Sequence, residues 1–205
     1  MEQGSAEWFQ ARVGRITASR IADVMAKTKS GESASRGNYM AQLVAERLTG
    51  LVEETFVSKE MLRGIEMEQF ARAAYENLRD VIVDQVGFIQ HPSILRSGAS
   101  PDGLVGDDGL IECKSPNTAT HIGYATSGII PAKYQIQMLF QMAVTGRAWV
   151  DFISYDDRLP DEMSLLVIRL NRDDKRIAEI EAEVIRLDEE VEATIEKLRG
   201  VKWAE

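Results

Sequence analysis

The chain of 205 residues has little that would bind a soft metal or form a disulfide. It contains one cysteine, Cys113, and two well-separated histidines, His91 and His121. A single cysteine excludes an intramolecular disulfide and fits a reducing cytoplasm, and so few ligands exclude a structural zinc site of the usual kind. No apolar run approaches the ~20 residues that span a membrane. The first ten residues lack the basic and apolar regions of a secretory signal, so we expect a cytoplasmic protein with no membrane contact.

Positive charge is also scarce, and it is unevenly placed. The net charge of −9 argues against a protein that coats nucleic acid non-specifically. Residues 173–197 include 10 acidic and 4 basic residues, a local net of −6, whereas residues 8–36 include 6 basic and 2 acidic residues, a net of +4. The N-terminal segment can therefore still hold a polyanion at one place.

Hydrophobic periodicity predicts one domain over residues 1–205, with an α/β fold in which helices flank a mixed sheet. We expect helices over residues 5–14, 15–27, 38–50, 59–78 and 132–146, strands over residues 81–92, 95–105, 109–115, 148–156 and 163–170, and irregular chain over residues 27–37 and 117–131. The helix over 59–78 is expected to bury a stripe made of Met67, Phe70, Ala74 and Leu78.

A long helix is predicted over residues 171–199. Its apolar residues recur every three or four positions: Ile177, Ile180, Val184, Leu187, Val191, Ile195 and Leu198. Packing within the chain is favoured for this stripe, while pairing with another subunit or docking of a partner remain alternatives.

The stretch SPDGLVGDDGLIECKSP, residues 100–116, concentrates carboxylates on a predicted hairpin. Residues i and i+2 of a strand share a face, so Glu112 and Lys114 point the same way and Cys113 points into the opposite layer. Asp102 ends the preceding strand, which the turn GDDG folds back beside Glu112. Two carboxylates this close repel each other unless a divalent cation lies between them. With the backbone carbonyl of Cys113 as a further oxygen, the ligands suit Mg²⁺, or Mn²⁺.

Lys114 would complete such a site for phosphate chemistry. Its ammonium group can position or deprotonate a water, or neutralise charge on a phosphate in the transition state. The structural alternative is that Pro-Asp-Gly is a turn and Glu-x-Lys a solvated strand face. The position of the motif on a predicted hairpin with the right strand order favours the metal site.

The segment W-x₃-R-x-G-x-x-T-A-S, which begins at Trp8, could bind an anion. A helix capped by Thr17 would offer free backbone N–H groups. Arg12 can fork onto a terminal phosphate, and Ser19 can add a hydroxyl donor. Taken alone, the segment is equally compatible with a plain helix cap and a surface arginine.

Two further helices carry polar residues of interest. Glu68 on the helix over 59–78 could face the sheet end and supply a metal ligand. Tyr134 and Gln137 lie one turn apart on the helix over 132–146 and so face together. Taken alone, a solvated glutamate and a solvated glutamine are the more ordinary interpretations.

Together these motifs, from Trp8 to about Leu170, resemble the lambda-exonuclease (YqaJ-type viral recombinase) family of the PD-(D/E)xK nuclease superfamily. The resemblance implies a restriction-endonuclease-like core and an Mg²⁺-dependent exonuclease, with two ions, that acts on linear double-stranded DNA. It implies that one strand is digested from a 5′-phosphorylated end, with release of mononucleotides, and that a 3′ single-stranded tail is left. A homotrimeric ring, a single-strand annealing partner and a phage or prophage origin in a bacterial host are also implied.

The resemblance assigns roles to individual residues. It implies that metal is held by Asp102, Glu112, the Cys113 carbonyl and Glu68, and that Lys114 activates water. It implies a 5′-phosphate pocket made of Arg12, Ser19, Ser100 and Gln137. Thr17 would shape that pocket as a cap, and Lys29 would touch DNA ahead of the site.

An endonuclease or junction resolvase of the same superfamily is the alternative enzyme. It would need no pocket for a terminal phosphate, so the segment that begins at Trp8 favours the exonuclease. A DNA clamp without activity is disfavoured because Asp102, Glu112 and Lys114 are all present. A ring would also fit the net charge, since an acidic exterior repels DNA while inward basic residues retain it by topology.

Overall fold

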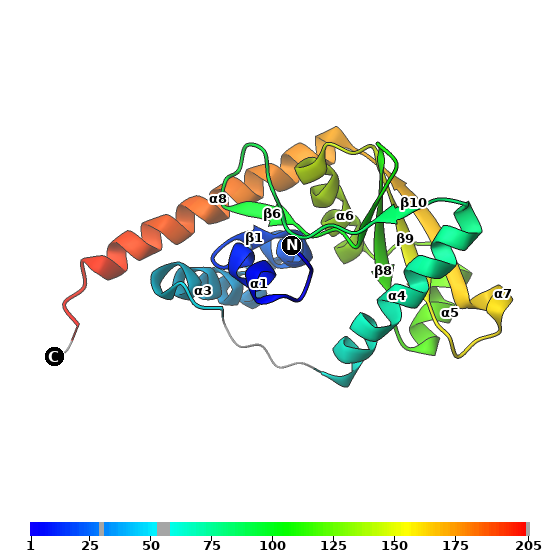
Figure 1. Cartoon of the computed structure of the whole chain (residues 1–205). Helices are drawn as coiled ribbons and strands as arrows, with labels where there is room; N and C mark the ends of the chain where they lie inside the picture. The colour runs from blue at the N-terminus through cyan, green and yellow to red at the C-terminus, as the bar shows by residue number, and fades with distance from the viewer. Residues whose placement is uncertain (29–30, 53–57, 204–205) are drawn as a thin grey trace.

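A five-stranded mixed sheet forms the centre of the protein in the computed structural model, which describes residues 1–28, 31–52 and 58–203 (Figure 1). The strand order is β10-β9-β8-β7-β4, in which β8 and β9 are parallel and the other neighbours are antiparallel. The bounds are β4 Val83–Asp84, β7 Gly103–Val105, β8 Gly109–Lys114, β9 Trp149–Tyr155 and β10 Leu165–Asn171. The predicted α/β class with helices around a mixed sheet is confirmed. Lys29 lies outside the described residues.

Strand β8 has a different helix on each of its faces. Helix α4, Lys59–Arg79, packs on the face that carries Ile111 and Cys113. Helix α6, Ala132–Thr145, lies over the other face, which carries Leu110. Because side chains alternate along a strand, this second face also carries the polar side chains near the end of β8. The predicted separation of the cysteine from its polar neighbours is therefore confirmed.

A smaller sheet lies beside the first, with the strand order β1-β6-β5. It consists of β1 Ile16–Thr17, β5 Ile89–Gln90 and β6 Ser97–Ala99. The single strand predicted over 95–105 is wrong, because β6 and β7 belong to different sheets and Asp102 lies between them. Pro101 lacks the N–H group that would continue the ladder, so the chain changes sheets there. Asp102 thus immediately precedes β7, where the two sheets meet.

The long C-terminal helix α8, Asp174–Arg199, confirms the prediction for this region (Figure 1). Six of the seven predicted apolar residues are buried, and Leu198 is partly buried. They pack against α2, Ile21–Val24, α3, Ala34–Thr49, and α6. Packing within the chain, the favoured alternative, is confirmed. Within the described ranges, no helix is both long enough and apolar enough to cross a membrane.

The acidic side chains of α8 pair with the basic N-terminal half of the protein. The pairs join Lys27 to Glu183 at 2.8 Å, Arg36 to Glu190 at 2.7 Å, and Arg47 to Asp188 at 2.5 Å. The two regions of opposite charge that are separate in the sequence are therefore neighbours in space. Part of the N-terminal positive charge is used within the chain and is not free for a polyanion.

Helix α5, Thr118–Ser127, occupies a segment predicted to be irregular, and that prediction is wrong. The side chain of Asn117 accepts a hydrogen bond from the Thr120 N–H at 2.9 Å and caps the helix. Gly128 ends it with a left-handed φ of +64°. Both caps are visible in the sequence, but the threonines and glycine between them lower the helix propensity.

The helix predicted over 15–27 is also wrong. The chain there forms β1, a 3₁₀ turn η1, Ala18–Arg20, and the short α2. The side chain of Thr17 makes no capping hydrogen bond, and a single 3₁₀ turn does not provide the helix dipole expected for anion binding. Pairing of Ile16 and Thr17 with β6 holds this segment extended instead.

Several smaller differences complete the fold. Helix α1 covers Ala6–Arg12 as expected, and a β2–β3 pair, Lys27–Thr28 and Gly31–Glu32, occupies the predicted loop. A short helix α7, Asp161–Ser164, precedes β10. The stripe predicted on α4 is wrong, because Phe70 and Leu78 are exposed and the buried residues are Met67, Ala71 and Tyr75. The small Ala71 allows the close packing of α4 against the sheet.

Candidate functional site

Glu112 is the centre of a polar cluster on β8, and it is only 1% exposed. Lys114, two residues further on the same face, donates from Nζ to Glu112 Oε1. Gln137 and Gln141 on α6 donate from Nε2 to Oε1 and Oε2 at 2.7 and 2.6 Å. A buried carboxylate needs such partners, because removal of its hydration is otherwise unfavourable.

Asp102 approaches the cluster from the start of β7. Its Oδ2 accepts a hydrogen bond from the Cys113 N–H at 2.6 Å, which ties it across the hairpin to the strand that carries Glu112. Burial raises the pKa of Asp102 well above its ordinary value, and the nearby charges of Glu112 and Glu68 raise it further. The ammonium of Lys114 and the Cys113 N–H oppose that shift only in part. This carboxyl group therefore lies where a positive charge would be strongly favoured.

Lys114 remains charged in this environment. Burial acts to lower the pKa of its ammonium, but the carboxylates of Glu112 and Asp102 outweigh that effect, so the pKa is raised. The ammonium also lies 5.2 Å from the ring centroid of Tyr134. Lys114 therefore brings a positive charge and a hydrogen-bond donor to Glu112.

Glu68 joins the cluster electrostatically from α4. Its Oε1 accepts a hydrogen bond from Arg72 at 3.4 Å, one turn along the helix. Burial raises the pKa of Glu68, while the charges of Arg72 and Lys114 act to lower it and Glu112 adds to the increase. Glu68 therefore lies within electrostatic range of Glu112 and Lys114, but it is partly engaged by its own helix.

The structure places two glutamines of α6, Gln137 and Gln141, against Glu112, which the sequence did not predict. Gln137 was expected beside Arg12, and the structure instead places its amide on Glu112. Gln141, which the sequence analysis missed, is fully buried, and its Oε1 has no hydrogen-bond partner among the described residues. Its position four residues after Gln137, on the same helical face, is the signal that could have found it.

A second feature is a cavity of about 170 Å³ between α1, η1 and α3. Arg12, Thr17 and Ser19 line it, and so does Arg20. The Arg12 guanidinium stacks 4.0 Å from the ring centroid of Trp8, and burial lowers its pKa because the charged group loses hydration. An arginine nevertheless stays protonated, so an anion that entered the cavity would relieve this penalty.

One hydrogen bond connects the cavity to the carboxylates. Trp8 Nε1, on the cavity wall, donates to Ser100 Oγ at 2.9 Å. Ser100 lies two residues before Asp102, and the Gln3 side chain donates to the carbonyl of the intervening Pro101 at 2.8 Å. The structure therefore ties Ser100, which is close in sequence to Asp102, to Trp8 on the cavity wall.

The side chains around Glu112 can be compared with the ligands that a metal ion requires. Across residues 1–28, 31–52 and 58–203, no three His, Cys, Asp or Glu side chains are grouped to hold one. Mg²⁺, however, commonly uses only one or two carboxylates and fills its other positions with water and substrate phosphate. Asp102 and Glu112 are hard-oxygen donors joined through the contact of Asp102 with the Cys113 N–H, and the chemistry of this pair suits such an ion.

Comparisons with known proteins agree with the fold described above. The model of the YqaJ-like viral recombinase domain matches residues 7–148. An alkaline exonuclease from Laribacter hongkongensis (LHK-Exo) is 54% identical, with a TM-score of 0.89 over 95% of this chain and 96% of that chain. The values are the same for LHK-Exo in complex with dAMP. A phage-related exonuclease from Haemophilus somnus 129PT is 13% identical and shares the fold, with a TM-score of 0.70 over 90% and 96% of the chains. No curated protein is significantly similar.

Proposed function

We propose that this chain, which belongs to the YqaJ-like viral recombinase family and is a deoxyribonuclease, is an exonuclease for linear double-stranded DNA. In this proposal it degrades one strand in the 5′-to-3′ direction from a 5′-phosphorylated end and releases mononucleotides. The observation that carries the proposal is the hydrogen bond from Trp8 to Ser100, which joins a cationic cavity to a buried carboxylate cluster. A terminal phosphate held in that cavity would place a neighbouring phosphodiester close to the carboxylates.

The carboxylate cluster would hold the metal that the family implies. Asp102, Glu112 and the Cys113 carbonyl are proposed as ligands for Mg²⁺, or Mn²⁺, with Glu68 serving a second ion. A divalent cation at such a site supplies charge stabilisation to the reacting phosphate and makes a bound water more acidic. Gln137 and Gln141 orient Glu112 from the α6 side.

The chain's own cations have distinct proposed roles. Lys114 holds a proton and directs it toward the site, where it can neutralise charge that develops on the phosphate. Arg12 supplies a planar donor for the terminal phosphate, and Ser19 supplies a hydroxyl group. Thr17 lines the cavity without acting as a helix cap.

The remaining parts of the proposal concern the biological setting. We propose a homotrimeric ring through which DNA threads, and a single-strand annealing protein that receives the 3′ tail. Both support phage-type recombination in the cytoplasm of a bacterial host. The net charge of −9 supports a protein that retains DNA by enclosure rather than by broad non-specific affinity.

Linear duplex DNA with one 5′-phosphorylated end and one 5′-hydroxyl end tests the proposal. We expect Mg²⁺-dependent release of mononucleotides from the phosphorylated end, survival of the opposite strand, and no cleavage of a closed circle. The measurement follows acid-soluble nucleotide together with the polarity of the surviving strand. Cleavage of the circle would instead support an endonuclease, and equal attack on both ends would remove the role of the cavity.

Substitution of Asp102 by asparagine is expected to stabilise the metal-free protein at neutral pH. The raised pKa of Asp102 means that the folded state favours its protonated form. The free energy of unfolding of the wild type should therefore fall as the pH rises above about 4, which is the ordinary pKa of an aspartate side chain. Asparagine stays neutral, and its oxygen can still accept from the Cys113 N–H.

Thermal unfolding from about pH 4 to about pH 8 checks this expectation. The melting temperature of Asp102→Asn should exceed that of the wild type by a margin that grows with pH. Added Mg²⁺ should stabilise the wild type and leave the variant unchanged. A variant that is less stable than the metal-free wild type at the upper pH would contradict the electrostatic account.

A further inference from the structure

The two walls of the cavity meet at one glycine. Helix α1 ends at Arg12, which lies on one wall, and β1 begins at Ile16, from which the chain leads to Thr17 and Ser19 on the other. Gly14, in the short link between them, has a φ of +65°. A change in the backbone at this link would move one wall relative to the other.

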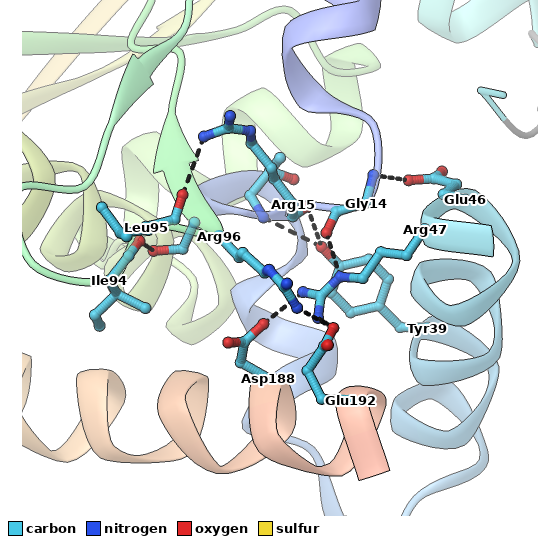
Figure 2. A network of polar contacts seen from close by, with 12 residues as sticks. Gly14, Arg15, Tyr39, Glu46, Arg47, Ile94, Leu95, Arg96, Asp188 and Glu192 are labelled. Atoms are coloured by element: carbon cyan, nitrogen blue, oxygen red, sulfur yellow. Dashed lines mark hydrogen bonds and ion pairs between the residues drawn. The ribbon is translucent and has the colours of Figure 1, made fainter. Parts of the chain in front are cut away.

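Both backbone groups of Gly14 are held by adjacent residues of α3 (Figure 2). Its N–H donates to Glu46 Oε2 at 2.7 Å, and its carbonyl accepts from Arg47 Nε at 2.8 Å. A Cβ at position 14 would lie 2.7 Å from Arg47 Cγ, so only glycine permits this approach. The turn is therefore clamped from both sides by side chains that are distant in sequence.

Glu46 also reaches the second wall. Its Oε1 accepts from Gln42 Nε2 at 2.8 Å, and Gln42 Oε1 accepts from Arg20 at 2.9 Å. A nearly buried carboxylate beside a cavity for an anion would be unfavourable unless its charge were used elsewhere. Here both oxygens of Glu46 accept hydrogen bonds. One accepts from the Gly14 N–H, and the other accepts from Gln42, which in turn contacts Arg20.

Arg47 connects the same link to α8. Its guanidinium pairs with Asp188 at 2.5 Å and with Glu192 at 2.8 Å, and Arg96 also pairs with Glu192 (Figure 2). The guanidinium is almost buried, with 9% of the side chain exposed. Three groups, Asp188, Glu192 and the Gly14 carbonyl, thus fix one arginine, and its Nε is directed at Gly14 with little freedom.

We infer that Glu46 and Arg47 are positioning residues that set the geometry of the terminal-phosphate pocket and, through it, the preference for a 5′-phosphorylated DNA end. The inference rests on the proposed function of the cavity. Neither residue needs to touch the phosphate. Glu46 determines where Arg12 and Arg20 lie relative to each other, and Arg47 transmits the rigidity of α8 to the link at Gly14.

The test measures kcat/KM on duplexes that differ only in a 5′-phosphate or 5′-hydroxyl end. In Glu46→Ala and Arg47→Met we expect the ratio of the two values to fall by about tenfold, since small displacements of a binding group have large effects. The fall should come from a higher KM on phosphorylated DNA, with the rate on hydroxyl ends unchanged. A merely structural role would lower both rates together.

Three comparisons make the test specific. Glu46→Gln keeps an oxygen for the Gly14 N–H but turns an NH₂ group toward the donor of Gln42, so it should lose less of the preference than Glu46→Ala. Glu190→Gln removes the carboxylate charge from the separate ion pair between Arg36 and α8 at 2.7 Å and should preserve the preference. Arg47→Lys cannot serve Gly14 and both α8 carboxylates at once, so it should show a partial loss and remains informative if Arg47→Met fails to fold.

The outcomes separate the inference from the proposed function. A wild type without any preference for phosphorylated ends would overturn both. A wild type that discriminates, together with folded Glu46→Ala and Arg47→Lys variants that discriminate equally well, would overturn the inference alone. A loss of preference of the same size in Glu190→Gln would also overturn it, because general loosening of α3 from α8 would then be the cause.

Discussion

Replacing Lys114 with alanine should reduce DNA cleavage by about a hundredfold to a thousandfold, because one preorganised donor at the developing charge is worth that much in comparable sites. Binding of linear duplex DNA should be retained, since the cavity that bears Arg12 is untouched. The structure supplies the reason, because Lys114 is held by Glu112 at the buried carboxylate cluster and stays protonated there. Alanine would leave two carboxylates with no internal cation.

Lys133 provides a matched control for Lys114. Lys133 on α6 lies 4.7 Å from the ring centroid of Tyr134, as Lys114 lies 5.2 Å from the same centroid. Lys133→Ala therefore removes an equal charge near the same aromatic ring without touching Glu112, and it should cleave DNA normally.

The measurement pairs single-turnover cleavage with DNA binding in Ca²⁺, and thermal unfolding confirms that each variant is folded. Full turnover by Lys114→Ala would show that the lysine is not part of the chemistry. Equal losses in Lys114→Ala and Lys133→Ala would assign the effect to general charge near Tyr134 rather than to the contact with Glu112.

Replacing Asp151 with alanine should lower the free energy of unfolding by about 3 kcal/mol, near the lower end expected when one partner of a buried ion pair is removed. Asp151 is fully buried on β9. It accepts two hydrogen bonds from Arg169 at 2.7 and 2.8 Å and one from the Tyr75 hydroxyl at 2.8 Å. Arg169 is 44% exposed and can regain water, which moderates the loss.

Urea unfolding compares the stability of Asp151→Ala with that of a control variant in an exposed ion pair. Asp174 contacts Arg172 at 2.6 Å but is 81% exposed, so Asp174→Ala should change stability by no more than about 0.5 kcal/mol. Similar values for the two variants would show that the contacts of Asp151 do not stabilise the fold. Activity should also fall in Asp151→Ala, because Tyr75 anchors the helix that carries Glu68.

Features encoded by local pattern were predictable from the sequence. The hairpin of β7 and β8 follows from two apolar runs around the turn GDDG, and its alternation places Glu112 and Lys114 on one face. Helix α8 follows from an apolar stripe that continues without interruption from Ile177 to Leu198. Such signals depend on neighbouring residues, so no knowledge of distant contacts is needed.

The predictions failed where distant contacts decide the structure. The segment before Arg20 was assigned to a helix, but pairing of β1 with β6 keeps Ile16 and Thr17 extended. The contacts of Gly14 with Glu46 and Arg47 span more than thirty residues of sequence, and no periodicity predicts them. The position of Gln137 similarly depended on how α6 lies over β8, which the sequence left open.

The placement of α8 also has a consequence for the order of synthesis. This helix follows all the other described elements in the chain, yet its carboxylates hold the arginine that fixes the cavity wall. A nascent chain on the ribosome can pair β7 with β8 early, because those strands are adjacent. The contacts that hold Arg47 from the α8 side must wait until residues 188–192 have emerged. The hairpin that carries Asp102 and Glu112 can therefore pair before the proposed pocket for DNA ends is fully braced.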